Sequence, residues 1–161
     1  MLIVVGETPF SLAGEPLVVL HNLSGAPSSA DTNICIHLLN RADPHIEQHF
    51  RARSPADIAV CSVVKAELRF GAHRSTRIDA NLQRLKLFFS PLQSLPFDDE
   101  CAEHYALIRV DLSAQGKLIG PNDLMIAAIA RAHEATLVTR NAGEFGRVAG
   151  LRLEDWQDPN G

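Results

Sequence analysis

The chain has 161 residues, of which 46% are hydrophobic and 21% are charged. This length suits one domain, and this composition excludes bulk disorder, collagen-like repetition and a coiled-coil rod. Fifteen Lys and Arg against nineteen Asp and Glu give a formal net charge of −4, which excludes nucleic-acid binding driven by overall positive charge but not a nuclease whose acidic pocket holds metal ions.

Residues 1–30 differ in composition from the rest of the chain, with three Gly, three Pro and no Lys or Arg. Two short apolar runs, residues 2–5 and 17–20, are compatible with strands, and residues 24–29 are typical of a flexible loop. Glutamates interrupt the apolar stretch and no basic residue precedes it, so we expect no export signal. We therefore expect an atypical, partly ordered segment over residues 1–30, a regular domain over 31–157 and a tail over 158–161.

From residue 31 onward, helical and strand patterns alternate at short intervals. The patterns predict helices over residues 34–40, 44–53, 63–71, 77–89, 99–115 and 121–133, and strands over residues 57–62, 92–97, 136–139 and 151–156. Pro44 suits a first helical turn, Asp98 suits a helix cap, and Gly116 suits a helix end. Strands that alternate with helices predict an α/β fold with a mainly parallel central sheet flanked by helices on both faces.

In an α/β fold, the active site usually lies at the carboxyl ends of the strands. Four acidic residues of this chain are candidates for such a site. Asp31 precedes a helix, where capping is the simpler interpretation. Glu67 shares a helix face with Val63 and Val64, so its carboxylate needs either a basic partner or a metal. Asp123 opens a helix that is apolar all round, where an interaction with the helix dipole is the local alternative.

Glu144 follows the strand predicted over residues 136–139, and a solvated loop charge is its simpler interpretation. Asn141 and Thr139 lie closer to the strand end and offer further oxygen atoms. Several carboxylates stay ionised side by side only when cations neutralise them, and oxygen-only ligands suit Mg²⁺ or Mn²⁺. One or two such ions orient water and stabilise charge at a phosphoryl centre.

Other chemistries have weaker support. The seven histidines lack metal-ligand spacing, and the chain has neither a P-loop nor a Gly-x-Ser-x-Gly motif. A phosphatase with an Asp nucleophile would need a second Asp where Asn33 stands. Six arginines are possible phosphate contacts, although a solvated helix face is the simpler interpretation: Arg51, Arg53, Arg69, Arg74, Arg77 and Arg84.

Cysteine usage and hydropathy indicate the compartment. Cys35, Cys61 and Cys101 are odd in number and show no close metal-type spacing, so they favour neither disulfides nor a zinc site. No stretch reaches the roughly 18 apolar residues of a membrane span. We therefore expect a soluble cytoplasmic protein with no membrane partner.

Several motifs follow one another along the chain. They are Asp-Thr-Asn-Ile-Cys-Ile at 31–36, Ala-Glu-Leu at 66–68 with Gly71, Leu-Pro-Phe at 95–97, Gly-Pro-Asn-Asp at 120–123 with Ile-Ala-Ala at 126–128, Leu-Val-Thr at 137–139 with Asn141 and Glu144, and residues 151–156. In this order the motifs resemble those of the PIN-domain ribonuclease toxins of the VapBC type. The resemblance implies a VapC-like PIN fold and an Mg²⁺- or Mn²⁺-dependent endoribonuclease. It further implies structured RNA such as tRNA as substrate, a homodimer, and a cognate antitoxin protein.

By motif, the resemblance assigns the main acidic, metal-binding positions to Asp31, Glu67 and Asp123, and the fourth catalytic position to Glu144. The supporting residues are Thr32, Asn33, Asn122, Thr139 and Asn141. Many relatives carry an Asp where this chain has Asn141, so Asn141 and Glu144 are both candidates for the fourth position.

The start of the chain departs from the family pattern. Residues 27–30 stand where the family has a hydrophobic strand that leads directly into the Asp-Thr-Asn motif. Either a loop is inserted here or the first 30 residues are an altered start. The alternative to an active nuclease is therefore a catalytically weakened PIN-like module that still binds a second copy or an antitoxin.

Overall fold

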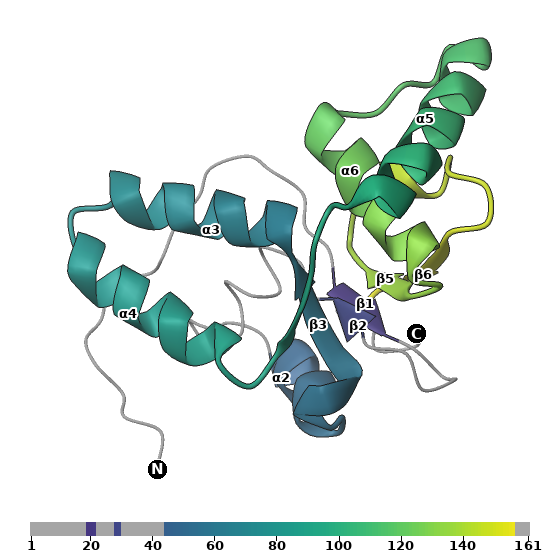
Figure 1. Cartoon of the computed structure of the whole chain (residues 1–161). Helices are drawn as coiled ribbons and strands as arrows, with labels where there is room; N and C mark the ends of the chain where they lie inside the picture. Colours follow the sequence, from purple (N-terminus) through teal and green to yellow (C-terminus); the bar gives the residue numbers. More distant parts are fainter. Residues whose placement is uncertain (1–18, 22–27, 30–43, 157–161) are drawn as a thin grey trace.

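The computed structural model of the chain describes residues 19–21, 28–29 and 44–156 (Figure 1). The helix expected over residues 34–40 and the apolar run over residues 2–5 lie outside these ranges. The same is true of three predicted site residues: Asp31, Thr32 and Asn33.

The described helices and strands follow the sequence patterns closely. The helices are α2 (Pro44–Arg51), α3 (Ser62–Arg74), α4 (Ile78–Phe89), α5 (Asp99–Ala114), α6 (Pro121–Ala132) and α7 (Ala142–Phe145), with a 3-10 turn, η1 (Pro55–Asp57). The strands are β1 (Val19–His21), β2 (Ser28–Ser29), β3 (Ile58–Cys61), β4 (Gln93–Leu95), β5 (Thr136–Val138) and β6 (Arg152–Glu154). The predicted elements from residue 44 onward are all present, with ends that differ by no more than three residues, whereas α7 and η1 have no counterpart among the predictions.

The six strands form one sheet in the order β2-β3-β1-β5-β6, and β4 also pairs with β3. The β2–β3, β3–β4 and β5–β6 pairs are parallel, which confirms a mainly parallel sheet. β1 departs from that prediction because it runs antiparallel to both β3 and β5. Since β3 and β5 each oppose β1, they run in the same direction and end at the same edge of the sheet.

Residues 28–29 correct the expectation of a loop over residues 24–29. They form β2, with Ser28 opposite Ile58 and Ser29 opposite Ala59. The physical reason is that the buried backbone groups of β3 need hydrogen-bond partners, which extended chain of any polarity supplies. β2 ends two residues before Asp31 in the sequence.

The core fills the space between the sheet and its helices. All residues of β3 and β5 are buried, as expected for strands covered on both faces. In Figure 1, α3 and α4 lie side by side next to β3, whereas α5 and α6 lie together beside β5 and β6. No helix in residues 44–156 is long and apolar enough to cross a membrane.

The predicted helix boundaries have the expected local causes. The Asp98 side chain accepts a hydrogen bond of 3.0 Å from the backbone N–H of Cys101 and caps α5. Gly116 follows α5 with φ of 65°, the left-handed conformation that favours glycine. Pro121 opens α6, where its missing N–H costs no helical hydrogen bond.

Candidate active site

The first part of the site is a contact between α3 and the start of α6. β3 leads directly into α3, which places Glu67 in the second turn of that helix. Glu67 Oε1 accepts a hydrogen bond of 2.7 Å from Asn122 Nδ2. This bond joins residues that are 55 positions apart in the sequence, and it brings two of the predicted motifs to one place.

Asp123 follows Asn122 in the first turn of α6. It is buried, with 7% of its surface exposed, and the apolar residues that follow it in α6 are buried in the core. A Cβ atom added to Gly120 would lie 3.4 Å from Asp123 Oδ2, so the carboxylate turns back toward the backbone at the helix start. The helix dipole stabilises negative charge at this end.

The second part of the site follows β5. Thr139 is buried; its N–H donates to the carbonyl of Glu154 at 2.8 Å, and its Oγ1 accepts from the N–H of Asn141 at 3.0 Å. This turn leads into α7, which carries Glu144 with its side chain half-buried. Glu144 therefore lies in a short helix and not in the loop that its simpler interpretation supposed.

The two parts belong to the same edge of the sheet. Glu67 follows the carboxyl end of β3, and Asn141 and Glu144 follow the carboxyl end of β5, which points the same way. The structure connects Glu67 with Asn122 directly, and Asp123 is the next residue of α6. Over the described ranges, Glu67, Asp123 and Glu144 do not by themselves form a group tight enough to share one ion.

The described donors are chemically suited to Mg²⁺ or Mn²⁺. The predicted ligands present carboxylate and amide oxygens, which hard divalent cations prefer. The Asn122 amide is a neutral donor, so it orients Glu67 without adding positive charge to the site.

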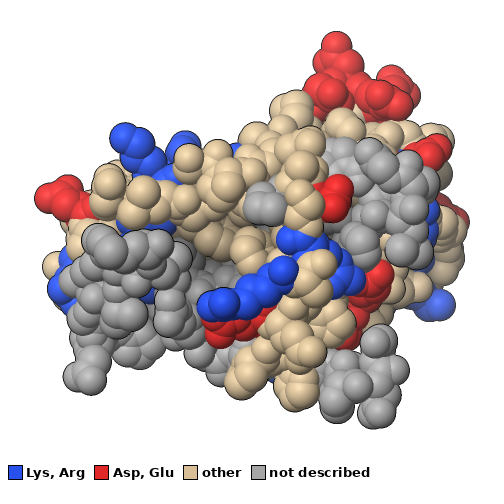
Figure 2. All heavy atoms as spheres, turned by 90° about the horizontal axis from the view of Figure 1, so that it is seen from below, with Lys and Arg blue, Asp and Glu red and all other residues tan. Residues whose placement is uncertain are grey.

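Charged side chains of both signs lie on the described surface (Figure 2). Figure 2 views the molecule from below the orientation of Figure 1 and shows basic and acidic side chains interspersed over the described part of that face. Two of the arginines considered as phosphate contacts are paired with carboxylates. Arg51 lies 2.6 Å from Glu47, and Arg53 lies 3.4 Å from Glu154.

One group of possible metal ligands is absent from the sequence-based predictions. Asp98, Cys101 and His133 approach one another between α5 and α6. Their signal is weak in the sequence because His133 is distant from the other two along the chain.

Comparisons with known proteins match most of the chain to one family. The PIN domain family profile matches residues 30–151. The chain is similar to Ribonuclease VapC2 of Rickettsia felis, with 39% identity over 127 residues, which is 78% of this chain and 95% of that protein. It is also similar to the tRNA(fMet)-specific endonuclease VapC of Shigella flexneri, with 38% identity over 126 residues and the same shares covered.

A solved structure supports the same relationship. The crystal structure of VapBC2 from Rickettsia felis bound to a promoter DNA fragment superposes with a TM-score of 0.72 and 37% identity. The match covers 78% of this chain and 95% of the chain in that structure.

Proposed function

The chain belongs to the VapC ribonucleases of the PIN-domain family, and from this premise we propose that it cleaves structured RNA with a divalent-metal site built on Asp31, Glu67 and Asp123. It is an endoribonuclease of the toxin–antitoxin type. The observation that carries the site is the hydrogen bond from Asn122 to Glu67 beside the buried Asp123.

The side chains have separate roles in this proposal. Asp31, Glu67 and Asp123 hold one or two Mg²⁺ or Mn²⁺ ions, and Asn122 fixes the carboxylate of Glu67. Glu144 or Asn141 occupies the fourth position at the end of β5. When bound, the ion supplies charge that stabilises the phosphoryl oxygens and acidifies a coordinated water.

The substrate follows from the relatives. The Shigella flexneri relative is named for its action on tRNA(fMet), which supports tRNA or a similar structured RNA as the substrate class here. Because the chain carries a net charge of −4, we infer that bound cations and local basic side chains, and not overall charge, attract the phosphates.

The proposed partners are a cognate antitoxin and a second copy of the chain. The solved neighbour is named as a VapBC complex, which supports an antitoxin whose Arg would compete with metal for the acidic residues. On α5, Leu107 and Val110 lie one turn apart and are 63% and 70% exposed, which supports self-association through an apolar surface. Light scattering that finds only a monomer at micromolar concentration would contradict the dimer.

The test of the metal site is Asp123→Asn. The variant keeps the volume and the buried position of the side chain but loses its charge, so it should fold. RNA cleavage in Mg²⁺ should fall by more than the roughly 10–100-fold that the loss of an outer-shell partner costs. Mn²⁺ binding should weaken in parallel, and EDTA should stop cleavage by the wild type.

A matched control is Asp79→Asn, since Asp79 also lies in a first helical turn but is exposed on α4. This variant should cleave RNA at the wild-type rate. Full cleavage by Asp123→Asn, or activity that resists EDTA, would refute the proposal. Mn²⁺ binding at wild-type strength without any cleavage of RNA would support the weakened binding module instead.

A further inference from the structure

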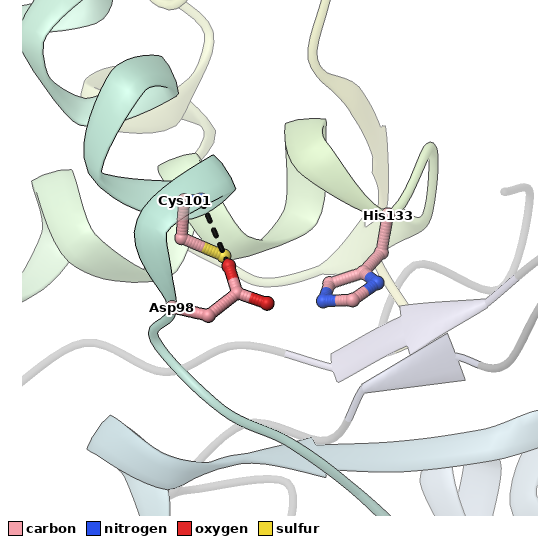
Figure 3. A group of neighbouring side chains, drawn as sticks. All are labelled: Asp98, Cys101 and His133. Carbon is pink, nitrogen blue, oxygen red and sulfur yellow. Dashed lines mark hydrogen bonds between the residues drawn. The ribbon is translucent and has the colours of Figure 1, made fainter.

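A carboxylate, a thiol and an imidazole lie close together between the start of α5 and the end of α6. Asp98 caps α5, Cys101 lies in its first turn, and His133 directly follows α6. One ligand atom from each residue lies within 4.8 Å of the others. Figure 3 draws the three side chains. Asp98 is exposed, Cys101 is fully buried and His133 is partly buried.

His133 provides a second, independent observation. Its Nε2 atom is buried and has no hydrogen-bond partner among the described residues. Figure 3 shows the ring pointing toward the carboxylate of Asp98. A buried ring nitrogen without a partner is unfavourable, so this position is suited to a cation that the nitrogen can bind.

The other two side chains can serve the same ion. One oxygen of Asp98 accepts the capping hydrogen bond from Cys101 N–H, and the second oxygen lies on the side of His133 (Figure 3). The Cys101 thiol donates a long hydrogen bond of 3.6 Å to the carbonyl of Pro96 and also interacts with the Asp98 carboxylate. A weak contact of this kind does not compete strongly with a metal–thiolate bond.

We propose that Asp98, Cys101 and His133 bind one divalent transition-metal ion of the Zn²⁺ class. A thiolate with an imidazole and a carboxylate suits Zn²⁺ or Co²⁺ and does not suit Mg²⁺. On binding, the sulfur gives up its proton to solvent and the imidazole binds in its neutral form. The exposed side of the group leaves a coordination position for water.

To bind zinc, the three ligand atoms must move slightly closer together. Zinc lies roughly 2.0–2.3 Å from such ligands, so tetrahedral geometry puts the ligand atoms roughly 3.3–3.7 Å apart. The 4.8 Å limit of the group must therefore shorten by about 1 Å. The bound ion would connect the end of α6 to the start of α5. Asp123 lies at the other end of α6.

The direct test titrates the purified full-length protein with Co²⁺ and records the thiolate-to-cobalt charge-transfer absorption. The wild type should develop this absorption with one equivalent of Co²⁺, and Zn²⁺ should displace it. Cys101→Ala should abolish it. His133→Gln should weaken Co²⁺ binding by at least about tenfold, the lower end of what a lost metal-site partner costs.

Three controls assign the signal. Cys61→Ala removes another buried thiol, Cys35→Ala removes the remaining cysteine, and Asp123→Asn removes a ligand of the proposed catalytic site. All three should keep the Co²⁺ absorption, so this site and the catalytic site can fail independently. Loss of the absorption in Cys35→Ala or Cys61→Ala would assign the thiolate elsewhere and overturn the proposal.

Thermal unfolding gives a second measurement. Zn²⁺ should raise the melting temperature of the wild type but not that of Cys101→Ala, and the metal-free melting curve of this variant shows whether it folds. A wild type without thiolate absorption, an equal Zn²⁺ effect in Cys101→Ala, or unchanged affinity in His133→Gln would each overturn the three-ligand site.

Discussion

Glu67 and Asn122 show how one neutral side chain can organise an acidic site. The amide donates a hydrogen bond of 2.7 Å to the carboxylate, which restricts the carboxylate without neutralising it. Asn122→Ala should therefore leave the fold intact but weaken Mn²⁺ binding and RNA cleavage by roughly 10–100-fold, as for other outer-shell partners of metal ligands. Isothermal titration with Mn²⁺ and initial cleavage rates measure the two effects.

A matched control for this variant is Asn81→Ala. The Asn81 amide also donates to a side-chain oxygen, Ser75 Oγ at 2.9 Å, but it joins the start of α4 to the preceding turn. This change should leave Mn²⁺ affinity at the wild-type value. Raised Mg²⁺ should partly restore cleavage by Asn122→Ala, and a lack of any rescue would argue that the amide acts on the fold and not on the metal site.

His49 makes stability depend on pH. Its ring stacks on Trp156 with centroids 5.6 Å apart. Arg53 Nη1 lies 3.3 Å from His49 Nδ1. Burial and, secondarily, the Arg53 charge lower the pKa of His49, His45 adds a smaller effect in the same direction, and Glu154 opposes them. Protonation of this ring in the folded protein is therefore unfavourable.

The sign of the effect follows from proton binding. Below about pH 6.5 the unfolded histidine takes up a proton, whereas the folded one does so only at lower pH. The stability contributed by His49 is complete above the unfolded pKa and is lost as the pH falls toward the folded pKa. His49→Phe keeps a stacking ring that does not titrate, so urea unfolding at pH 7.5 and 5.5 should show a smaller loss than in the wild type. An equal loss in both proteins would contradict this origin.

At the scale of elements, the sequence is most informative where many residues share one pattern. The spacing of Leu82, Leu85 and Phe89 predicts the helix over residues 77–89, and the latter two lie in the core. The uninterrupted apolar run before Ser62 predicts a strand, which is buried throughout as β3. The three described acidic motifs lie on or beside the elements predicted for them.

The features that sequence reasoning missed depend on tertiary contacts or on very few residues. α7 has four residues and β2 has two, which is too short for any periodicity. β2 exists because β3 offers backbone partners, and its serines carry no strand signal of their own. The Asp98, Cys101 and His133 group is assembled by the packing of α5 against α6, so no motif spacing in the sequence indicates it.

The end of α5 provides a prediction at this scale. Gly116 has φ of 65°, and a Cβ atom added to it would meet no atom within 4 Å, so a side chain there would be strained by the backbone and not by crowding. Gly116→Ala should destabilise the protein by about 1 kcal/mol, which corresponds to about 2–4 °C in melting temperature for a domain of this size.

Gly143→Ala serves as the matched control for this change. Gly143 lies in α7, also has open space around it, and does not have a positive φ. Alanine there should leave the melting temperature unchanged or raise it, because alanine favours a helix over glycine. A similar loss in both variants would show that the αL conformation of Gly116 is not the cause.

At the scale of the whole molecule, the strand arrangement ties the atypical N-terminal segment to the site. β1 lies between β3 and β5 and pairs with both, with Leu20 opposite Ala59 and opposite Leu137. The elements that carry Glu67 and Glu144 follow those two neighbours of β1. The composition of residues 1–30 is atypical for this chain, but a strand between β3 and β5 has a structural role.

We therefore expect the native segment to contribute both stability and activity. Replacing residues 1–30 by a short Met-led Val/Leu strand should give a melting temperature and an Mg²⁺-dependent cleavage rate that are unchanged or lower. Deleting residues 1–30 outright should lower both. β3 would lose β1 and β2, β5 would lose β1, and their backbone groups would be left unpaired.

The two variants together separate the role of β1 from the role of sequence in this segment. If a Val/Leu replacement melts higher and cleaves faster than the wild type, the native segment weakens the site and the molecule is closer to the impaired PIN-like module. If the deletion variant matches the wild type in both measurements, β1 contributes nothing and Asp31 does not depend on it. If instead only the deletion loses cleavage, any strand between β3 and β5 suffices. The site would then need only that β3 and β5, which precede its carboxylates, stay joined in one sheet.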